Sequence, residues 1–145
     1  MNELALDNKI AAVYQVSELM AHYAKRLDAC DLTGWAELFA PDARYFVASM
    51  ENVKAGNSLL LMNDDTKSKI EDRVRFVEQF WEGSYNDYLS RHVLSLPLLL
   101  DVRDDCVDFE QSFALYMTEN DVSSDQMGTS QVLCVGSYRG SVRVG

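Results

Sequence analysis

The stretch from Tyr23 to Tyr45 constrains the fold most, because it joins a helix end, a second helix and the start of a strand within one short segment. Asp31 is well placed to cap the second helix through its side-chain carboxylate. Trp35 and Phe39 follow on one apolar face at helical spacing. The segment therefore predicts a long helix, a short helix from about Leu32 to Phe39, and a strand directly after it.

The chain before this stretch has the period of an amphipathic helix. Asp7 or Asn8 is a suitable N-cap, and the pattern predicts a helix that runs to about Ala29. Its apolar residues repeat at helical spacing, at Ile10, Val13, Tyr14, Ala21, Tyr23, Ala24 and Leu27. We expect these residues to form the buried face of the helix.

The middle of the chain predicts a strand, a polar loop and a third helix. Residues 43–50 have a strand-like composition, residues 51–57 are polar with Gly56 for a turn, and residues 58–62 form a short apolar run. Residues 63–66 offer several N-caps for the helix. Its buried stripe is predicted at Ile70, Val74, Val77 and Trp81, and Gly83 ends it.

The last third changes to the period of two that is typical of strands. Residues 91–103 are apolar, and Pro97 among them indicates an edge position or a bulge. Apolar and polar residues alternate over 107–117, which predicts a strand with one buried face. A polar connection over 119–129 and a strand over 130–144 complete a hairpin. Helices first and strands last predict an α+β fold, with N-terminal helices packed on a strongly bent, mostly antiparallel sheet.

Length and composition fit one globular domain over residues 1–145. The chain has 145 residues, and 48% of them are apolar, enough for a hydrophobic core. Its net charge of −10 would repel phosphate backbones, so nucleic-acid binding is not expected. No run approaches the roughly 18 to 20 apolar residues that span a bilayer. The acidic N-terminus lacks the basic and apolar regions of a signal peptide, so a cytoplasmic protein is expected.

The cysteines and histidines are too few and too far apart for a metal cluster. Cys30, Cys106 and Cys134 are widely spaced, which fits reduced thiols packed as small core residues. His22 and His92 stand alone, without a CxxC or CxH pair, and a surface position is expected for His22. We therefore expect no metal and no cofactor on this chain.

Several short motifs occur in an order that resembles the small (beta) subunits of aromatic-ring-hydroxylating dioxygenases. They are Leu27-Asp28, Trp35-Ala-Glu-Leu-Phe39, Asp42-Ala-Arg-Tyr45, Glu51-Asn52, Ile70-Glu-Asp-Arg73-Val74, Ser90-Arg91-His92, Ser112-Phe113-Ala-Leu-Tyr116 and Val135-Gly136-Ser-Tyr138-Arg139. The resemblance implies the cystatin-like cone of the nuclear transport factor 2-like (SnoaL-like) superfamily. Members of the family commonly have Asp where Gly140 stands here and continue into a further strand, without which a sheet edge is left for a partner to cover.

The resemblance also implies a structural role without catalytic residues. The metals would be held by a large alpha subunit, as a Rieske [2Fe–2S] cluster and a mononuclear non-haem iron. The two subunits would assemble as an alpha3beta3 hexamer that oxygenates aromatic compounds. In isolation the small subunit would form a homotrimer or a dimer.

The wider superfamily also contains stand-alone dehydratases, isomerases and cyclases, which leaves a second hypothesis open. In a cone pocket His92 would act as general acid or base, with Tyr23 and either Asp28 or Asp31 as polarising partners. Structural roles compete with this hypothesis: capping for Asp31, core packing for Tyr23, a salt bridge for Asp28 and a structural contact for His92. A non-catalytic ligand-binding or dimerisation domain is a third hypothesis.

Overall fold

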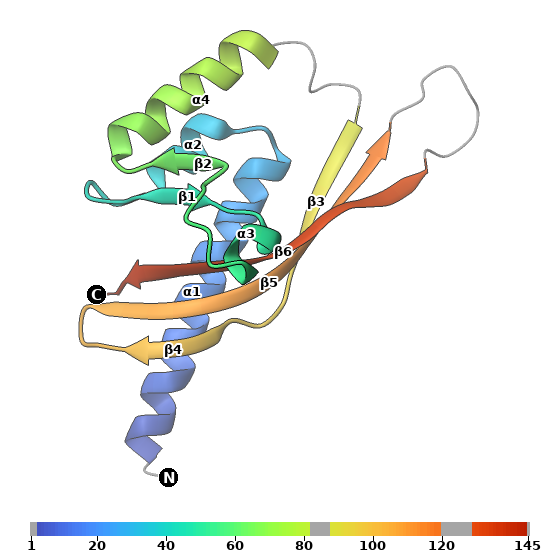
Figure 1. Ribbon diagram of the computed structural model, residues 1–145. Coiled ribbons are helices and arrows are strands. Elements are labelled where there is room, and N and C mark those ends of the chain that lie inside the picture. The colour runs from blue at the N-terminus through green and yellow to red at the C-terminus, as the bar shows by residue number, and fades with distance from the viewer. Residues whose placement is uncertain (1–2, 82–87, 120–128, 145) are drawn as a thin grey trace. The chain divides into compact units, whose positions relative to one another are not determined.

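The computed structural model describes residues 3–81, 88–119 and 129–144 (Figure 1). The chain forms two compact units, one of Met1–Cys30 with Tyr85–Gly145 and the other of Asp31–Ser84. Each unit has its own strands and its own helical packing. Within the described ranges, no helix is long and apolar enough to cross a membrane.

The first unit is a four-stranded antiparallel sheet with one long helix. Its elements are α1 (Glu3–Asp28), β3 (Tyr88–Leu94), β4 (Leu98–Val102), β5 (Cys106–Glu119) and β6 (Ser130–Arg143). β5 is the central strand: β3 and β4 pair with its second and first halves along one edge, and β6 pairs along the other edge (Figure 1). α1 packs against β3, β4 and β5. The predicted α+β class and the predicted pairing of the last two strands are confirmed.

The apolar run predicted over residues 91–103 separates into two strands. β3 ends at Leu94 and β4 begins at Leu98, with the buried Pro97 in the connection between them. Because proline has no N–H to give to a ladder, this connection suits it better than a strand interior. The pairing register of β4 shifts between Leu99 and Asp101, so the irregularity lies just after the proline.

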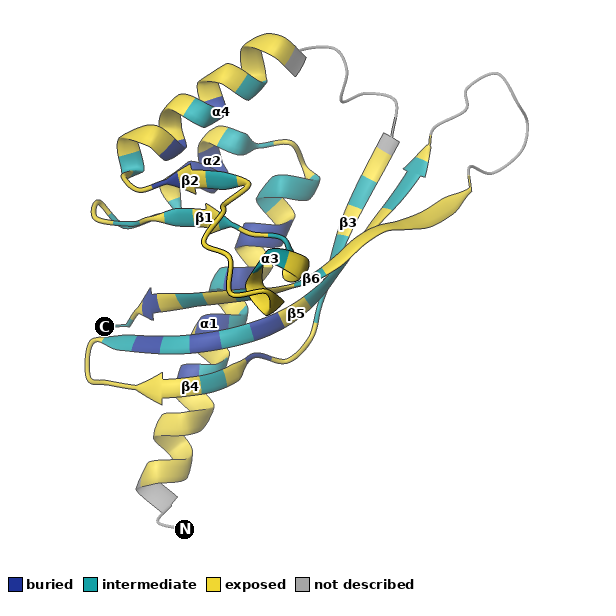
Figure 2. Cartoon of the chain, in the orientation of Figure 1, coloured by how far each residue is buried: buried dark blue, intermediate teal, exposed yellow. Residues whose placement is uncertain are grey.

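The buried face of α1 differs in part from the predicted one. It consists of Ala12, Val16, Met20, Tyr23 and Ala24 (Figure 2). Ile10 and Tyr14, predicted as apolar face residues, are 57% and 65% exposed. The helix begins at Glu3 rather than at the predicted caps, and its first turns extend past β4, where they are exposed (Figures 1 and 2). Helical spacing alone does not show where the sheet that covers a helix begins.

Aromatic side chains fill the space between the sheet and α1. The rings of Phe113 and Tyr138 stack with their centroids 4.4 Å apart, and Tyr23 of α1 meets the Tyr138 ring edge-on at 5.3 Å. Phe113 lies opposite Gly136 in the ladder between β5 and β6. A Cβ atom at position 136 would lie 2.7 Å from the Phe113 ring. The glycine therefore makes room for the ring on which the stack is built.

Gly140 makes room for a second ring in the same way. It lies opposite Phe109, and a Cβ atom there would lie 3.3 Å from the Phe109 ring. Phe109 is only 4% exposed, so the ring has little space to move aside. The glycine at this position, where the resemblance leads us to expect aspartate, thus matches the ring across from it.

Gly136→Ala is expected to lower the free energy of unfolding by about 1–3 kcal/mol, because the added methyl group overpacks the Phe113 ring. Urea denaturation followed by circular dichroism measures this loss. Gly140→Ala is the matched control, and its loss should be smaller because the closest ring atom is 3.3 Å rather than 2.7 Å away. Equal losses at the two positions would contradict this steric explanation.

The second unit consists of three helices and a two-stranded antiparallel sheet. Its elements are α2 (Leu32–Glu37), β1 (Tyr45–Val47), α3 (Met50–Lys54), β2 (Met62–Asp64) and α4 (Lys67–Trp81). The carboxylate of Asp31 accepts a hydrogen bond from the Gly34 N–H at 2.9 Å, which confirms the predicted cap of α2. Trp35 meets the rings of Phe39 and Tyr45 edge-on, at centroid distances of 4.8 and 5.3 Å.

The strand predicted over residues 43–50 is shorter than expected, because a helix starts where the strand was expected to continue. β1 ends at Val47, and Ser49 caps α3 by accepting a hydrogen bond from the Asn52 N–H at 3.2 Å. The loop predicted over 51–57 therefore contains a helix, and Gly56 follows it with a φ of 68°. The apolar run at 58–62 is largely exposed, and β2 begins only at its last residue.

The helix predicted after residues 63–66 is present as α4. Thr66 caps it, since its Oγ1 atom accepts a hydrogen bond from the Lys69 N–H at 3.2 Å. Ile70 and Val74 are buried and Val77 is half-buried, which confirms the stripe at these positions. The side chain of Trp81 and all of Gly83 lie outside the described residues, as does most of the polar connection predicted over 119–129.

One buried ion pair ties α4 to β2. Arg73 donates from Nε and Nη2 to the two carboxylate oxygens of Asp64, at 2.5 and 2.9 Å. Asp64 is 5% exposed, so its charge depends on this partner. The hydrogen bond from the guanidinium to the Asp64 carboxylate raises the pKa of Arg73. The arginine of the Asp-Arg-Val motif therefore has a structural role within its own unit.

Candidate functional site

Asp28 is the centre of a polar cluster that joins the end of α1 to β3. Its Oδ1 atom lies 2.7 Å from His92 Nδ1 and accepts a hydrogen bond from Ser90 Oγ at 3.2 Å. Its Oδ2 atom accepts a hydrogen bond from the backbone N–H of His92 at 3.0 Å. The side chains of His92 and Asp28 are 10% and 12% exposed, so water competes little for these contacts.

The backbone contact shows which edge of β3 faces α1. β3 pairs with β5 along one edge, and the His92 N–H donates to the Asp28 carboxylate on α1. A strand edge with unpaired N–H groups is prone to pair with other chains. Asp28 therefore covers part of this edge and, through Nδ1, fixes the orientation of the His92 ring.

Ser90 belongs to one of the motifs quoted from the sequence, but it was not predicted as a site residue. Its hydroxyl donates to the same carboxylate oxygen that contacts the His92 ring. Residues two apart in a strand project on the same face, so Ser90 and His92 are neighbours as soon as β3 is recognised. This spacing was the signal that could have placed Ser90 beside the histidine.

An open hollow of about 670 Å³ lies along the same contact. α1 contributes small side chains to it, including Ala21 and Ala24, and β3 contributes Leu89 and Leu94. The charged residues Lys25 and Arg91 line it together with Asp28 and His92. The hollow is thus mainly apolar with a few polar groups, as ligand sites commonly are.

The structure brings two of the four predicted site residues together. Asp28 and His92 are in direct contact and line the hollow. Tyr23 is buried against Tyr138 and is not one of the lining residues, and Asp31 caps a helix of the other unit. The acid–base arrangement of the second hypothesis is therefore represented only by the Asp28–His92 pair, whose carboxylate already accepts three hydrogen bonds.

The prediction that the cysteines are core residues is wrong for at least two of them. Cys30 and Cys134 are exposed, Cys106 is half-buried, and all three are free thiols. Cys30 lies just beyond the end of α1 with a φ of 56°, and Cys134 lies in the exposed first part of β6. His22 is exposed, as predicted. In the part of the chain that the structure describes, no three His, Cys, Asp or Glu side chains come together as metal ligands.

Asp28→Ala is expected to speed amide hydrogen exchange at His92, because that N–H loses its acceptor. The free energy of unfolding should also fall by roughly 1–3 kcal/mol, since poorly solvated donors are left unpaired. Exchange measured by NMR gives the first quantity and urea denaturation the second. Ser90→Ala removes one donor and leaves the carboxylate, so it serves as the control with a protected His92 amide. Unchanged exchange in the Asp28→Ala variant would contradict the assigned contact.

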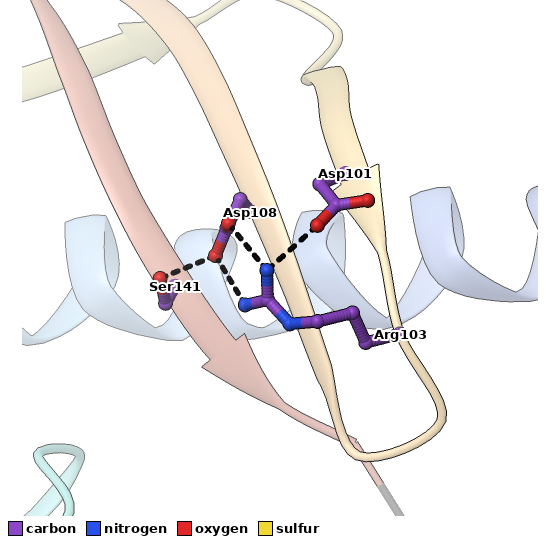
Figure 3. Close-up of polar contacts among 4 residues, drawn as sticks. All are labelled: Asp101, Arg103, Asp108 and Ser141. Atoms are coloured by element: carbon purple, nitrogen blue, oxygen red, sulfur yellow. Dashed lines mark hydrogen bonds and ion pairs between the residues drawn. The ribbon is translucent and has the colours of Figure 1, made fainter.

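A second polar cluster closes the turn between β4 and β5 (Figure 3). Arg103 donates from Nη1 and Nη2 to the two carboxylate oxygens of Asp108, at 2.9 Å each, and from Nη1 to Asp101 at 2.7 Å. Ser141 of β6 donates to the same Asp108 carboxylate at 2.5 Å. The hydrogen bonds from Arg103, and then the one from Ser141, lower the pKa of Asp108. The cluster therefore links three neighbouring segments of the sheet through one carboxylate.

The Arg103 cluster should make the β4–β5 turn sensitive to acid. Because the pKa of Asp108 lies below its ordinary value of 3.8 in the fold, the cluster stabilises the protein above that value and its contribution is lost as pH falls through the lowered pKa. Arg103→Gln should raise the pKa of Asp108, as measured from its carboxyl carbon shift in an NMR titration. Arg139→Gln removes only a weak, longer-range charge and is the control. An Asp108 titration midpoint that is unchanged in the Arg103→Gln variant would contradict this assignment.

The chain matches the family model described as ring hydroxylating beta subunit over residues 22–134, a span that includes the Asp28 cluster. The small oxygenase component of the p-cumate 2,3-dioxygenase system from Pseudomonas putida is 26% identical over 119 residues, which cover 80% of this chain and 66% of that protein. The small subunit of anthranilate 1,2-dioxygenase from Burkholderia cepacia is 25% identical over 129 residues, which cover 89% of this chain and 75% of that protein.

The fold is also similar to that of a solved structure. A crystal structure named as the beta subunit of an aromatic-ring-hydroxylating dioxygenase from Novosphingobium aromaticivorans has a TM-score of 0.76 and is 26% identical, covering 92% of this chain and 79% of that one. It agrees with the family match in both fold and sequence. The chain therefore belongs to the family of ring-hydroxylating beta subunits.

Proposed function

We propose that this chain is the structural small subunit of a multicomponent aromatic-ring oxygenase, and that catalysis takes place on a large alpha subunit. The observation that carries the proposal is the family match over residues 22–134. The alpha subunit would supply a Rieske [2Fe–2S] cluster and a mononuclear non-haem iron. This chain would supply a folded surface on which the alpha subunit assembles.

The residue inventory supports a division of labour between two chains. A Rieske centre takes two histidine and two cysteine ligands, and a facial triad takes two histidines and a carboxylate. The whole chain has two histidines, too few to serve both kinds of centre.

The sheet face opposite α1 has the character of a surface that binds a protein partner. Its apolar residues are 40% to 73% exposed and form what we call the outer patch: Val93, Tyr116, Val132 and Val135. The strand registers make them neighbours, since Val93 and Val135 both lie opposite Ala114, and Val132 lies opposite Tyr116. Contiguous exposed apolar patches commonly mark protein–protein contacts.

The names of the relatives favour one class of substrate for the assembled oxygenase. p-Cumate and anthranilate, after which two relatives are named, are both aromatic carboxylates. We therefore propose an aromatic carboxylate as the substrate of the complex.

An alpha3beta3 hexamer is the proposed assembly.

The proposal predicts that the chain co-purifies with a large oxygenase subunit encoded in the same genome when the two are expressed together. Val135→Lys should weaken this association, because it places a charge in the outer patch at a position that is 73% exposed in the free chain. Leu6→Lys, on the exposed first turns of α1, is the matched control and should co-purify normally. Failure of the unchanged chain to bind any Rieske subunit, or iron-dependent turnover by the isolated chain, would contradict the proposal.

A further inference from the structure

We propose that the hollow between α1 and β3 binds an aromatic carboxylate on this chain itself. Every residue that lines the hollow belongs to the first unit. Binding is therefore a property of the isolated chain and does not need the large subunit. Its volume of about 670 Å³ falls within the range of roughly 300–1,000 Å³ that small-molecule sites occupy.

The walls of the hollow suit a flat apolar group. The lining residues Ala21 and Ala24 of α1, and Ala29 just beyond its end, end at Cβ, so the surface there is shallow. Leu89 and Leu94 of β3 supply larger apolar side chains on the other side. A ring that lies between the alanines and the leucines would bury apolar area on both of its faces.

Two cations line the same hollow without an acidic partner. Lys25 and Arg91 are both exposed, and neither makes an ion pair with a described side chain. Nη1 of Arg91 donates to the backbone carbonyl of Ser90 at 2.7 Å, which leaves its other N–H groups for a ligand. Arginine binds carboxylates through two parallel N–H groups, so a carboxylate is the anion that fits best.

Asp28, the acidic residue that lines the hollow, does not pair with the two cations that would bind the ligand. The Asp28 carboxylate accepts its hydrogen bonds from Ser90 and His92, and none from Lys25 or Arg91. Lys25 and Arg91 together outweigh the single Asp28 carboxylate in the hollow, so on a chain with a net charge of −10 they form a local point of attraction for anions.

A small molecule fits this hollow better than a peptide of a partner chain. An added peptide strand gains its affinity from backbone hydrogen bonds to a free strand edge. Along β3 the outward N–H of His92 is already bound to Asp28, so that ladder cannot form there. The remaining attractions, apolar walls and two cations, are those that a single aromatic carboxylate can satisfy.

Titration of the isolated full-length chain with benzoate, followed by NMR of the backbone amides, tests the site. We expect saturable shifts at Ala21, Lys25 and Arg91, and binding of the neutral isostere benzamide that is weaker by roughly tenfold or more, because the charge-assisted hydrogen bonds are lost. The double variant Lys25→Gln with Arg91→Gln should weaken benzoate binding to a similar extent. Lys9→Gln with Arg139→Gln changes the net charge equally at two residues of the first unit that do not line the hollow, and should bind benzoate normally.

A steric variant tests the same site independently of charge. Ala21→Leu fills the hollow from an exposed position on α1 and should abolish benzoate binding, whereas Ala11→Leu, at another exposed alanine of the helix, should not. Non-saturable shifts, equal binding of benzamide, or insensitivity to these variants would overturn the proposal. Binding of a polyglutamate peptide in place of benzoate would overturn it too and would identify the hollow as a protein-docking site. Since no large subunit is present, none of these results depends on the assembly of the oxygenase.

Discussion

A single carboxylate, that of Asp28, fixes the place where the helix of the first unit meets its sheet. Its hydrogen-bond donors, Ser90 and His92, come 62 and 64 residues later in the chain, after the whole second unit. Closing a loop of that length costs conformational entropy, which contacts at the junction must offset. The same carboxylate covers a strand edge and sets the direction of the histidine ring, so helix docking and edge protection depend on one residue.

The two faces of the sheet in the first unit differ in the side chains that they carry. The inner face carries the aromatic stack, in which Phe113 and Tyr138 pack toward α1. The outer face is apolar around Val135 and charged around Asp108, at opposite ends of β6. Because charged groups resist burial, a partner is favoured to dock on the apolar end and to leave the ion pairs in water. Such polarity suits a subunit whose contribution is assembly.

The spacing of residues along the sequence predicted the features that are local, such as caps and buried helix faces. It did not predict contacts between residues that are far apart in the chain. The Asp31 cap and the Ile70 stripe follow from local spacing, and both are present. Helix α3 was missed because it is short and polar, and only its Ser49 cap marks it. Asp28 and His92 were each identified as candidates, but their contact depends on the return of the chain after the second unit. No local pattern encodes that return, and no pattern of small residues alone reveals a hollow.

The closeness of Gly136 to Phe113 has a consequence for the evolution of the sheet. A side chain at position 136 and a phenyl ring at 113 cannot share the same space, since a Cβ atom would lie 2.7 Å from the ring. Two such positions are free to drift only as a pair, with a smaller residue at one compensating a larger residue at the other. Divergent members of the lineage should therefore show correlated replacements across this rung of the ladder, even where overall identity has faded.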